Sequence, residues 1–206
     1  MRNFKRGARH PKPSDSFSLV ELLVVMAIIA VLAALILVAG NGAINTGMRS
    51  RAKTEIQAMS TAAEGYKTDN GIYPQGDGAL LTNSAANPYS DTTYDGTSTE
   101  YQTNSTALYT ALSGQNYFGA TPVAGTKVYM SFKANQVGNV GGPFSYIMDP
   151  WTKSYGYSTG STGTSTPSYP YNGSGFFDLW STGGVTTAQV SAKPGLTNTW
   201  ISNWTQ

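Results

Sequence analysis

One apolar run near the start of the chain limits what this sequence can fold into. The 23 positions from Phe17 to Ala39 contain a single charged side chain, Glu21. As an α-helix that rises 1.5 Å per residue, the run is roughly 34 Å long, enough to cross a hydrocarbon core of ~30 Å with some tilt. The sequence therefore predicts a helix that spans a membrane.

Basic residues before the run predict its orientation. Five of the 13 Lys and Arg residues of the chain fall within the first 16 positions, beside one acid, Asp15, and they are Arg2, Lys5, Arg6, Arg9 and Lys12. Because basic flanks stay on the cytoplasmic side, we expect a cytoplasmic N-terminus and an external remainder. The formal net charge of +2 thus averages a basic leader and a slightly acidic remainder.

A cleaved secretory signal peptide is the alternative for this pattern. Two features argue against it. The run is longer than the 7–15 apolar residues of a signal peptide, and its end at residues 38–43 offers only a weak small-residue cleavage pattern. The run also continues into a helical pattern without a turn. We therefore favour a helix that is retained.

Glu21 suggests more than a plain anchor. A carboxylate four residues into an apolar span costs about 2.5–3.5 kcal/mol to insert and calls for a cationic partner. No basic residue lies within a helical turn of Glu21 inside the span. If the chain were cut between Ser16 and Phe17, the new amine of one subunit would be a partner for Glu21 of its neighbour. The acid would then favour the polymer over the lone subunit.

The residues SFSLVELLVVMAIIAVLAALILVAG, which begin at Ser16, resemble the amino-terminal segment of type IV prepilins and type II secretion pseudopilins. The resemblance implies that a prepilin peptidase cuts between Ser16 and Phe17 and methylates the new amine, giving N-methylphenylalanine. It also implies that Glu21 is the assembly acid. Two residues depart from the family: Ser16 stands where leaders usually end in Gly, and Val38 where many members have a helix-kinking Pro.

The helical pattern continues beyond the apolar run. Apolar residues recur at steps of three and four, at Ile56, Met59, Ala63 and Tyr66, which is one face of an α-helix. Asp69, Asn70 and Gly71 favour a helix end there, and Pro74 forbids continuation. We expect one helix of about 50 residues, with a transmembrane and assembly half at 17–40 and an amphipathic half at 41–72, after a leader at 1–16.

The remaining residues, 73–206, are expected to form a weakly charged head. A short helix is predicted over Thr103–Leu112, with Ser105 or Thr106 as its cap. Strand-like runs rich in aromatic and β-branched residues follow at 127–132, 144–148, 154–159, 175–180 and 199–204. Asp149 and Pro150 predict the turn of a hairpin. The fold class is therefore α+β and type IV pilin-like: the long N-terminal helix packs on a small antiparallel sheet.

Short patches of the head sharpen the resemblance. DPW at 149–151, FDLWSTGG at 177–184 and ISNW at 201–204 occur in the order found in the major pseudopilin of type II secretion. The segments at about 85–145 and 158–175 look like insertions without a counterpart. The second of these is rich in Ser, Thr and Gly, and is expected to form a long loop.

Major pseudopilins hold Ca²⁺ in their last loop, and this feature is expected not to transfer. Hard Ca²⁺ wants six to eight oxygens, typically several from carboxylates. No acidic residue occurs between Leu179 and Gln206, and Val185 and Trp200 occupy the positions that resemble the ligand aspartates. The weak candidates that remain are Leu179, Ser181 and Gly183. We expect no cofactor, and expect Trp180, Trp200 and Trp204 to hold the loop by packing.

The sequence does not favour an enzyme. The chain has no Cys, and its one His, His10, lies in the leader. No nucleophile triad, P-loop or dinucleotide-binding glycine pattern is present. Asp149 and Asp178 are an acid pair in principle, but Asp149 is interpreted as a turn former and Asp178 as a strand residue.

These observations favour a structural subunit of a type II secretion pseudopilus. The resemblance implies a helical homopolymer, a prepilin peptidase, other pseudopilins, and an inner-membrane assembly platform with its ATPase as partners, with no nucleic acid. It also implies a single pass through the bacterial inner membrane and a periplasmic head. Two alternatives stay open: a type IV pilin for adhesion, motility or DNA uptake, and a membrane-tethered binding module with an uncut leader.

Overall fold

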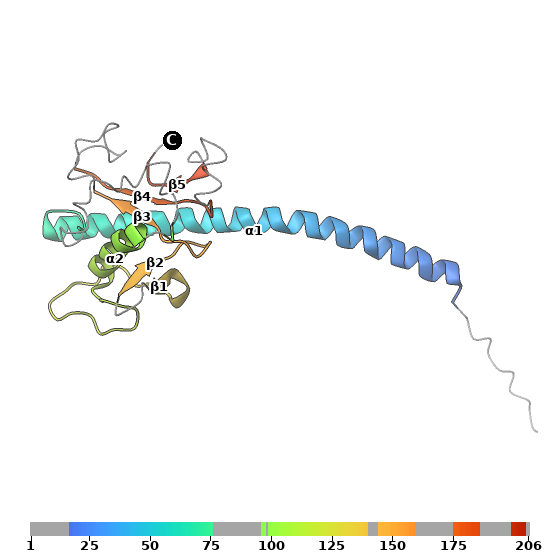
Figure 1. The fold of residues 1–206 in the computed structure, drawn as a ribbon, viewed down its shortest axis with the longest axis horizontal. Helices are drawn as coiled ribbons and strands as arrows, with labels where there is room; N and C mark the ends of the chain where they lie inside the picture. Colours follow the sequence, from blue (N-terminus) through green and yellow to red (C-terminus); the bar gives the residue numbers. More distant parts are fainter. Residues whose placement is uncertain are drawn as a thin grey trace, which may run out of the picture. The chain divides into compact units, whose positions relative to one another are not determined.

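A computed structural model describes residues 17–75, 96–97, 99–139, 144–159, 175–185 and 199–204. The leader at 1–16, Ser16 included, and most of the Ser/Thr-rich loop at 158–175 lie outside these residues. In chain order the elements are α1 (Leu19–Asn70), α2 (Thr99–Ser113), a 3-10 turn η1 (Ala134–Gln136), β1 (Val137–Asn139), β2 (Ser145–Ile147), β3 (Gly156–Ser158), β4 (Asp178–Ser181) and β5 (Ile201–Ser202) (Figure 1). This order of a long apolar helix, a second helix and small antiparallel sheets confirms the α+β, pilin-like fold class.

Helix α1 is 52 residues long and ends where the sequence predicted. Gly71 follows it with φ +78°, and its amide donates to the Lys67 carbonyl at 2.8 Å. Such a left-handed residue is the common way to end an α-helix, and glycine adopts it without a steric penalty. The chain divides within α1 into two units, Met1–Ile44 and Asn45–Gln206, which we describe separately.

In the second unit, the predicted apolar stripe of α1 forms one wall of the core. Ala52, Ile56, Met59 and Ala63 are buried and cluster with Leu108 and other residues of α2 and the strands. Tyr66 packs at the edge of this cluster, and its ring lies 5.3 Å from that of Tyr129. The three-and-four spacing therefore identified the face of α1 that the head covers.

Helix α2 is longer than predicted and begins at Thr99. Ser105 and Thr106 are therefore interior residues, and the prediction that one of them caps the helix was wrong. The Ser105 hydroxyl lies 2.9 Å from the Ile147 amide, which donates to it, and 3.2 Å from the Ile147 carbonyl. These buried bonds fix α2 against β2, since neither group has access to water.

The described strands form two antiparallel sheets rather than the single sheet expected. β1 pairs with β2, and β3, β4 and β5 form the other sheet in that order. The predicted turn after β2 is present, because the Asp149 amide donates to the Lys153 carbonyl at 2.7 Å. Only one bridge, Met148 with Ser154, follows it. The Tyr155 amide adds one more bond of this hairpin, to the Ile147 carbonyl at 3.0 Å, and the Ser154 amide donates to the Gly96 carbonyl at 2.8 Å.

The run at 127–132 was predicted to be a strand and forms none. The amides of Tyr129 and Met130 both donate to the Leu112 carbonyl, at 2.8 and 3.0 Å. Leu112 lies in the last turn of α2, where carbonyls lack partners within the helix. The run therefore closes the end of α2 with the donors that a sheet would have used.

A glycine sets the spacing between β3 and β4. Gly156 lies opposite Trp180 in the register of the two strands. A Cβ on Gly156 would stand 2.1 Å from Cε2 of Trp180, so only glycine leaves room for the indole ring. Trp180 in turn stacks on Trp200, with ring centroids 5.9 Å apart, and meets Trp204 edge-on at 5.8 Å. The expected packing of the three tryptophans is confirmed.

A buried carboxylate joins α1 to the rest of the head. Glu55 accepts hydrogen bonds from Arg51 Nε at 2.8 Å, Gln136 Nε2 at 2.9 Å and the Tyr155 hydroxyl at 2.7 Å. Glu55 and Tyr155 are both buried. A buried charge is tolerated when it is paired and hydrogen-bonded in this way, so the three donors hold η1 and the segment before β3 on the helix.

Candidate processing and assembly site

The first turn of α1 is closed by two of its own side chains. Ser18 precedes the helix, and its hydroxyl accepts a bond from the Val20 amide at 3.3 Å. In return, Glu21 Oε2 accepts the Ser18 amide at 2.8 Å. This reciprocal arrangement is a variant of the capping box, and we use that name for it: the Ser18 hydroxyl serves the second helical amide instead of the third, and Glu21, three residues after Ser18, returns a bond to the Ser18 amide.

The capping box gives Glu21 a role that the sequence analysis missed. The signal was present, because Ser-x-x-Glu before an apolar run is the usual signature of a helix start. The partial positive charge of a helix N-terminus also favours a carboxylate there. Glu21 therefore finds a donor within its own chain, and a neighbour's amine is not needed to satisfy Oε2.

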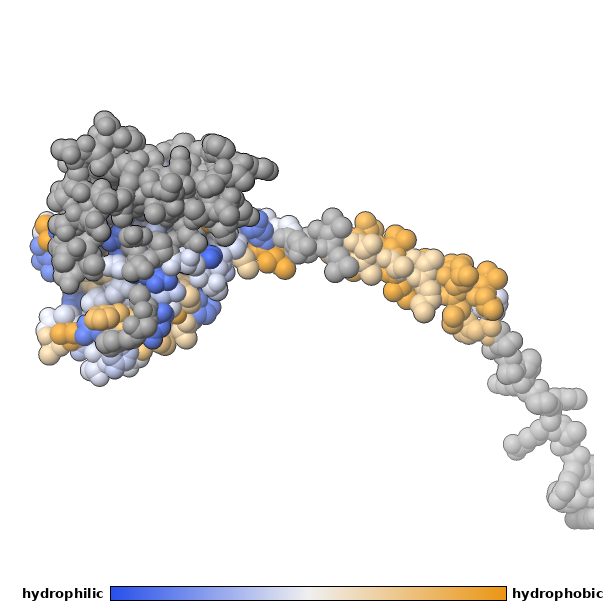
Figure 2. Space-filling model, viewed as in Figure 1, coloured by the Kyte–Doolittle hydropathy of each residue, from blue (hydrophilic) through white to orange (hydrophobic). Residues whose placement is uncertain are grey.

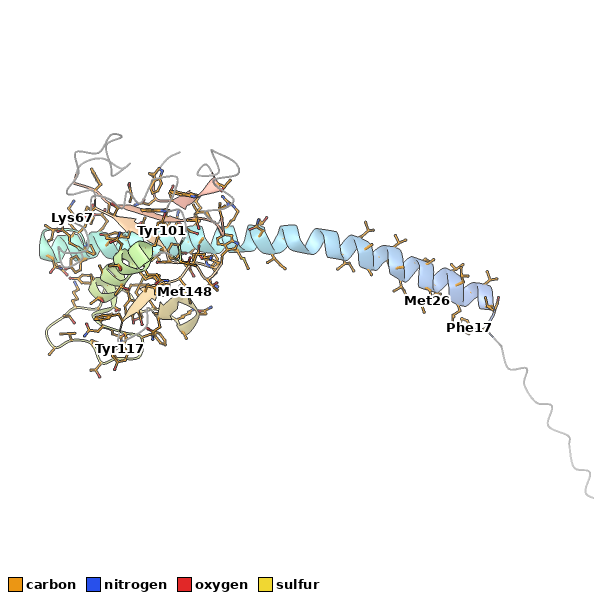
Figure 3. The ribbon with its side chains drawn as sticks, viewed as in Figure 1. Phe17, Met26, Lys67, Tyr101, Tyr117 and Met148 are labelled. Atoms are coloured by element: carbon orange, nitrogen blue, oxygen red, sulfur yellow. The ribbon has the colours of Figure 1, made fainter. Side chains whose placement is uncertain are left out.

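Phe17 and the residues after it present a long apolar surface that only Ser18 and Glu21 interrupt. The window Leu19–Ile36 is long and apolar enough to cross a membrane, and none of it is buried within the chain. Phe17 is 81% exposed at the start of the helix, and Met26 projects further along it (Figure 3). Figure 2 shows this part of α1 almost entirely in the colour of apolar residues. A contiguous apolar surface of this extent marks a contact with lipid or with protein.

The weak calcium candidates do not fit a Ca²⁺ site. The Leu179 carbonyl accepts the Asn203 amide at 3.0 Å. The Ser181 hydroxyl lies 2.5 Å from Asp149 Oδ2 and accepts the Gly183 amide at 3.0 Å. Gly183 also faces a cation, because Nη1 of Arg49 lies 3.3 Å from the position of a Cβ at Gly183. The positive charge of the guanidinium disfavours Ca²⁺ at this point.

Asp149 and Asp178, the acid pair named from the sequence, both occupy structural positions in the head. Asp149 Oδ1 accepts the amides of Trp151 at 3.0 Å and Lys153 at 2.9 Å, which is the turn-forming role expected of it. Burial raises the pKa of Asp149, and its hydrogen bonds to Ser181 and to the turn amides oppose that rise. Asp178 lies buried in β4, as expected. Within the described ranges, no three His, Cys, Asp or Glu side chains gather where they would hold a metal.

Comparison with known proteins gives one match. Residues 12–37 match the family described as the prokaryotic N-terminal methylation motif. The matched range contains Ser16, Phe17 and Glu21, and the whole of the exposed apolar window Leu19–Ile36. No curated protein and no solved structure matches the chain.

The match supports a type IV prepilin-like protein. The motif indicates a precursor of the kind that a prepilin peptidase processes and that assembles into filaments, and proteins of this kind are typically structural rather than enzymatic. The apolar window is compatible with a single-pass anchor in the inner membrane. The motif does not distinguish pseudopilins from pilins, because it ends at residue 37 and leaves the head unmatched.

Proposed function

We propose that this protein is a structural subunit of a type II secretion pseudopilus. In this proposal a prepilin peptidase cuts between Ser16 and Phe17 and methylates the new amine. The subunit is then polymerised by an inner-membrane platform and its ATPase, together with other pseudopilins, and the fibre drives protein export. The observation that carries the proposal is the fully exposed apolar window of α1, which begins at a methylation motif.

The apolar window supports polymerisation through its chemistry. Its side chains meet lipid while the subunit is in the membrane. When the subunit leaves the bilayer, burial against other copies becomes the alternative to contact with water, and each buried methylene contributes ~0.8 kcal/mol. Helices packed against one another would therefore supply the cohesion of the filament, and Glu21 with the Phe17 amine would set the register between copies.

The proposed topology follows the distribution of charge. The five bases of the leader favour a cytoplasmic N-terminus, so the head at 73–206 lies in the periplasm. The subunit is a single-pass protein of the bacterial inner membrane until it enters a fibre that spans the periplasm.

Three patches of the head favour a pseudopilus over a surface pilus, and each has a structural role here. DPW forms the turn after β2, FDLWS contains β4, and Asn203 of ISNW donates to the Phe177 carbonyl at 3.1 Å. A type IV pilin for adhesion, motility or DNA uptake is the second candidate, favoured by the same amino-terminal motif. A membrane-tethered binding module is the third.

Intact mass spectrometry of the chain produced with a prepilin peptidase tests the proposal. The expected mass is that of a chain that begins at Phe17 and carries one added methyl group. Ser16→Gly, which keeps a small residue before the cut, is the matched control and should give the same product. A retained leader would contradict processing and favour the tethered module.

Deletion in the source cell distinguishes the two fibres. Loss of a pseudopilin should leave exported proteins in the periplasm while surface fibres persist. Loss of a pilin should remove surface fibres while export continues, and this second result would overturn the pseudopilus assignment.

A further inference from the structure

An open groove of about 650 Å³ lies within the second unit, between α1 and the residues around β5. One wall consists of Thr46, Arg49, Ser50 and Lys53 of α1. The other includes Trp200 and Trp204. The processing and assembly site described above uses none of these residues.

The polar lining of the groove is made of donors. Arg49 and Lys53 are four residues apart, so both side chains lie on one face of α1. Ser50 and Ser202 add hydroxyls, and none of the lining residues that the structure describes is acidic. Within the described part of the chain neither Arg49 nor Lys53 forms an ion pair, whereas Arg51 between them is bound to Glu55. A groove with two cations and no carboxylate suits an anion.

The tryptophans that line the groove, Trp200 and Trp204, favour an anion that also carries an apolar portion. Tryptophan combines a large apolar ring with a polar N–H, and Trp, Arg and Lys are the side chains that accumulate where protein meets the polar surface of a bilayer. A phospholipid has groups that complement both walls of the groove. Its phosphate would contact the cationic side chains, and its glycerol and acyl portion would contact the tryptophan rings.

The covalent chain brings such a ligand within reach. Thr46 follows Ile36, the last residue of the apolar window, by ten positions. Even fully extended, ten residues span at most ~35 Å, so in an inserted chain the groove stays within that distance of the end of the apolar window. Bases that flank the outer side of a span are depleted as a rule, so the pair Arg49 and Lys53 is unusual under the proposed topology.

We propose that this groove binds the phosphate headgroup of an anionic phospholipid from the bilayer that holds α1. Arg49 offers two parallel N–H donors to the phosphate oxygens, and Lys53 adds a second positive charge. The proposal rests on membrane anchoring and on neither leader cleavage nor filament formation. Its failure and the failure of the proposed function are therefore distinguishable.

Native mass spectrometry of the full, uncut chain in detergent micelles tests this inference. Phosphatidylglycerol and phosphatidylcholine with identical acyl chains are added in equal amounts, and the lipids that stay bound are counted. The expected result is a preference of about fivefold or more for phosphatidylglycerol. Arg49→Gln/Lys53→Gln should remove most of this preference, and circular dichroism should show unchanged helix content because both side chains are exposed.

A charge-matched control separates the groove from general attraction. Lys127→Gln/Lys133→Gln removes two exposed charges elsewhere in the head and should keep the preference. An equal loss in both double variants, or no loss in the groove variant, would overturn the proposal. So would retention of added inorganic phosphate without a lipid preference, since the ligand would then be the free ion. A dimer that the groove variant abolishes, formed in place of the lipid adduct, would identify a second copy as the occupant.

Discussion

The Tyr155 hydroxyl lies 2.7 Å from Glu55 Oε2, and this hydrogen bond joins residues 100 positions apart in the chain. The bond is buried, and it connects the middle of α1 to the segment that leads into β3. Burial and the adjacent Glu55 charge both raise the pKa of Tyr155, so the phenol remains a donor across the physiological range. The bond is thus a long-range link between the helix and the sheet.

Replacement of Tyr155 by Phe should measure this link. The variant keeps the ring and removes one donor from a buried carboxylate, which typically costs about 1.5–3 kcal/mol for a bond to a charged group. Denaturant unfolding should show this loss in the free energy of unfolding. Tyr117→Phe, at an exposed tyrosine, is the matched control and should change stability little. Equal stability of the two variants would show that the Tyr155 bond contributes nothing.

Gly156→Ala should disrupt the packing of β3 on β4. The new Cβ would meet the Trp180 ring at 2.1 Å, and such overpacking costs 1–3 kcal/mol or more. The near-ultraviolet circular dichroism of the tryptophans should change along with the loss of stability. Gly47→Ala is the control, because a Cβ added at Gly47 would have no other atom within 4 Å. On the helix surface, Ala should stabilise by roughly 0.5–1 kcal/mol. A neutral Gly156→Ala would contradict the close approach.

Two substitutions should separate the capping role of Glu21 from its proposed assembly role. Glu21→Gln keeps an oxygen that can accept the Ser18 amide, so the helix start should persist while filaments fail to form for lack of a charge. Ser18→Ala removes the hydroxyl of the cap, at a cost of about 0.5–2 kcal/mol, and leaves the charge in place. Hydrogen exchange of the first-turn amides reports the cap, and electron microscopy reports filaments. Normal filaments from Glu21→Gln would show that an ion pair between Glu21 and the neighbour's Phe17 amine is not needed for assembly.

The ion pair at the end of α1 should give the head an acid-sensitive contribution. Lys127 Nζ lies 2.6 Å from Asp69 Oδ2, and this bond, with a second from Tyr129, lowers the pKa of Asp69 below its usual 3.8. A lowered pKa in the fold means that the contribution is complete above pH ~4 and is lost as the pH falls through the folded value. In Lys127→Gln, carboxyl NMR titration should show the pKa of Asp69 shifted upward. An unshifted titration would rule out the pair in solution.

Removal of calcium should leave the head unchanged. The Leu179 carbonyl and the Ser181 hydroxyl, two of the candidate ligands, already have hydrogen-bond partners, and the Arg49 guanidinium faces Gly183. Thermal unfolding with and without a strong calcium chelator should therefore give midpoints within about 1 °C. A fall of several degrees, reversed by added Ca²⁺, would show that the last loop holds the ion.

Elements that depend on local sequence patterns could be predicted. Elements that depend on contacts between residues far apart in the chain could not. The buried face from Ile56 to Ala63 was predicted correctly, because the helical repeat alone decides which residues share a face, whatever packs on it. The run at 127–132 has the composition of a strand, but its fate depended on the Leu112 carbonyl, which residue order alone does not bring near. The closeness of the Arg49 guanidinium to Gly183 could not be predicted from the sequence for the same reason. The capping box, by contrast, was predictable from the sequence, because it depends only on the spacing of Ser18 and Glu21.

The capping box also changes how filament growth would proceed. With Glu21 already bound to Ser18 in the single chain, joining a neighbour replaces one partner by another instead of supplying a first one. Such an exchange has a smaller free-energy change than the rescue of an isolated charge, so each addition is closer to reversible. A fibre built from such steps would release its subunits into the bilayer more easily than one in which each addition rescued an unpaired charge.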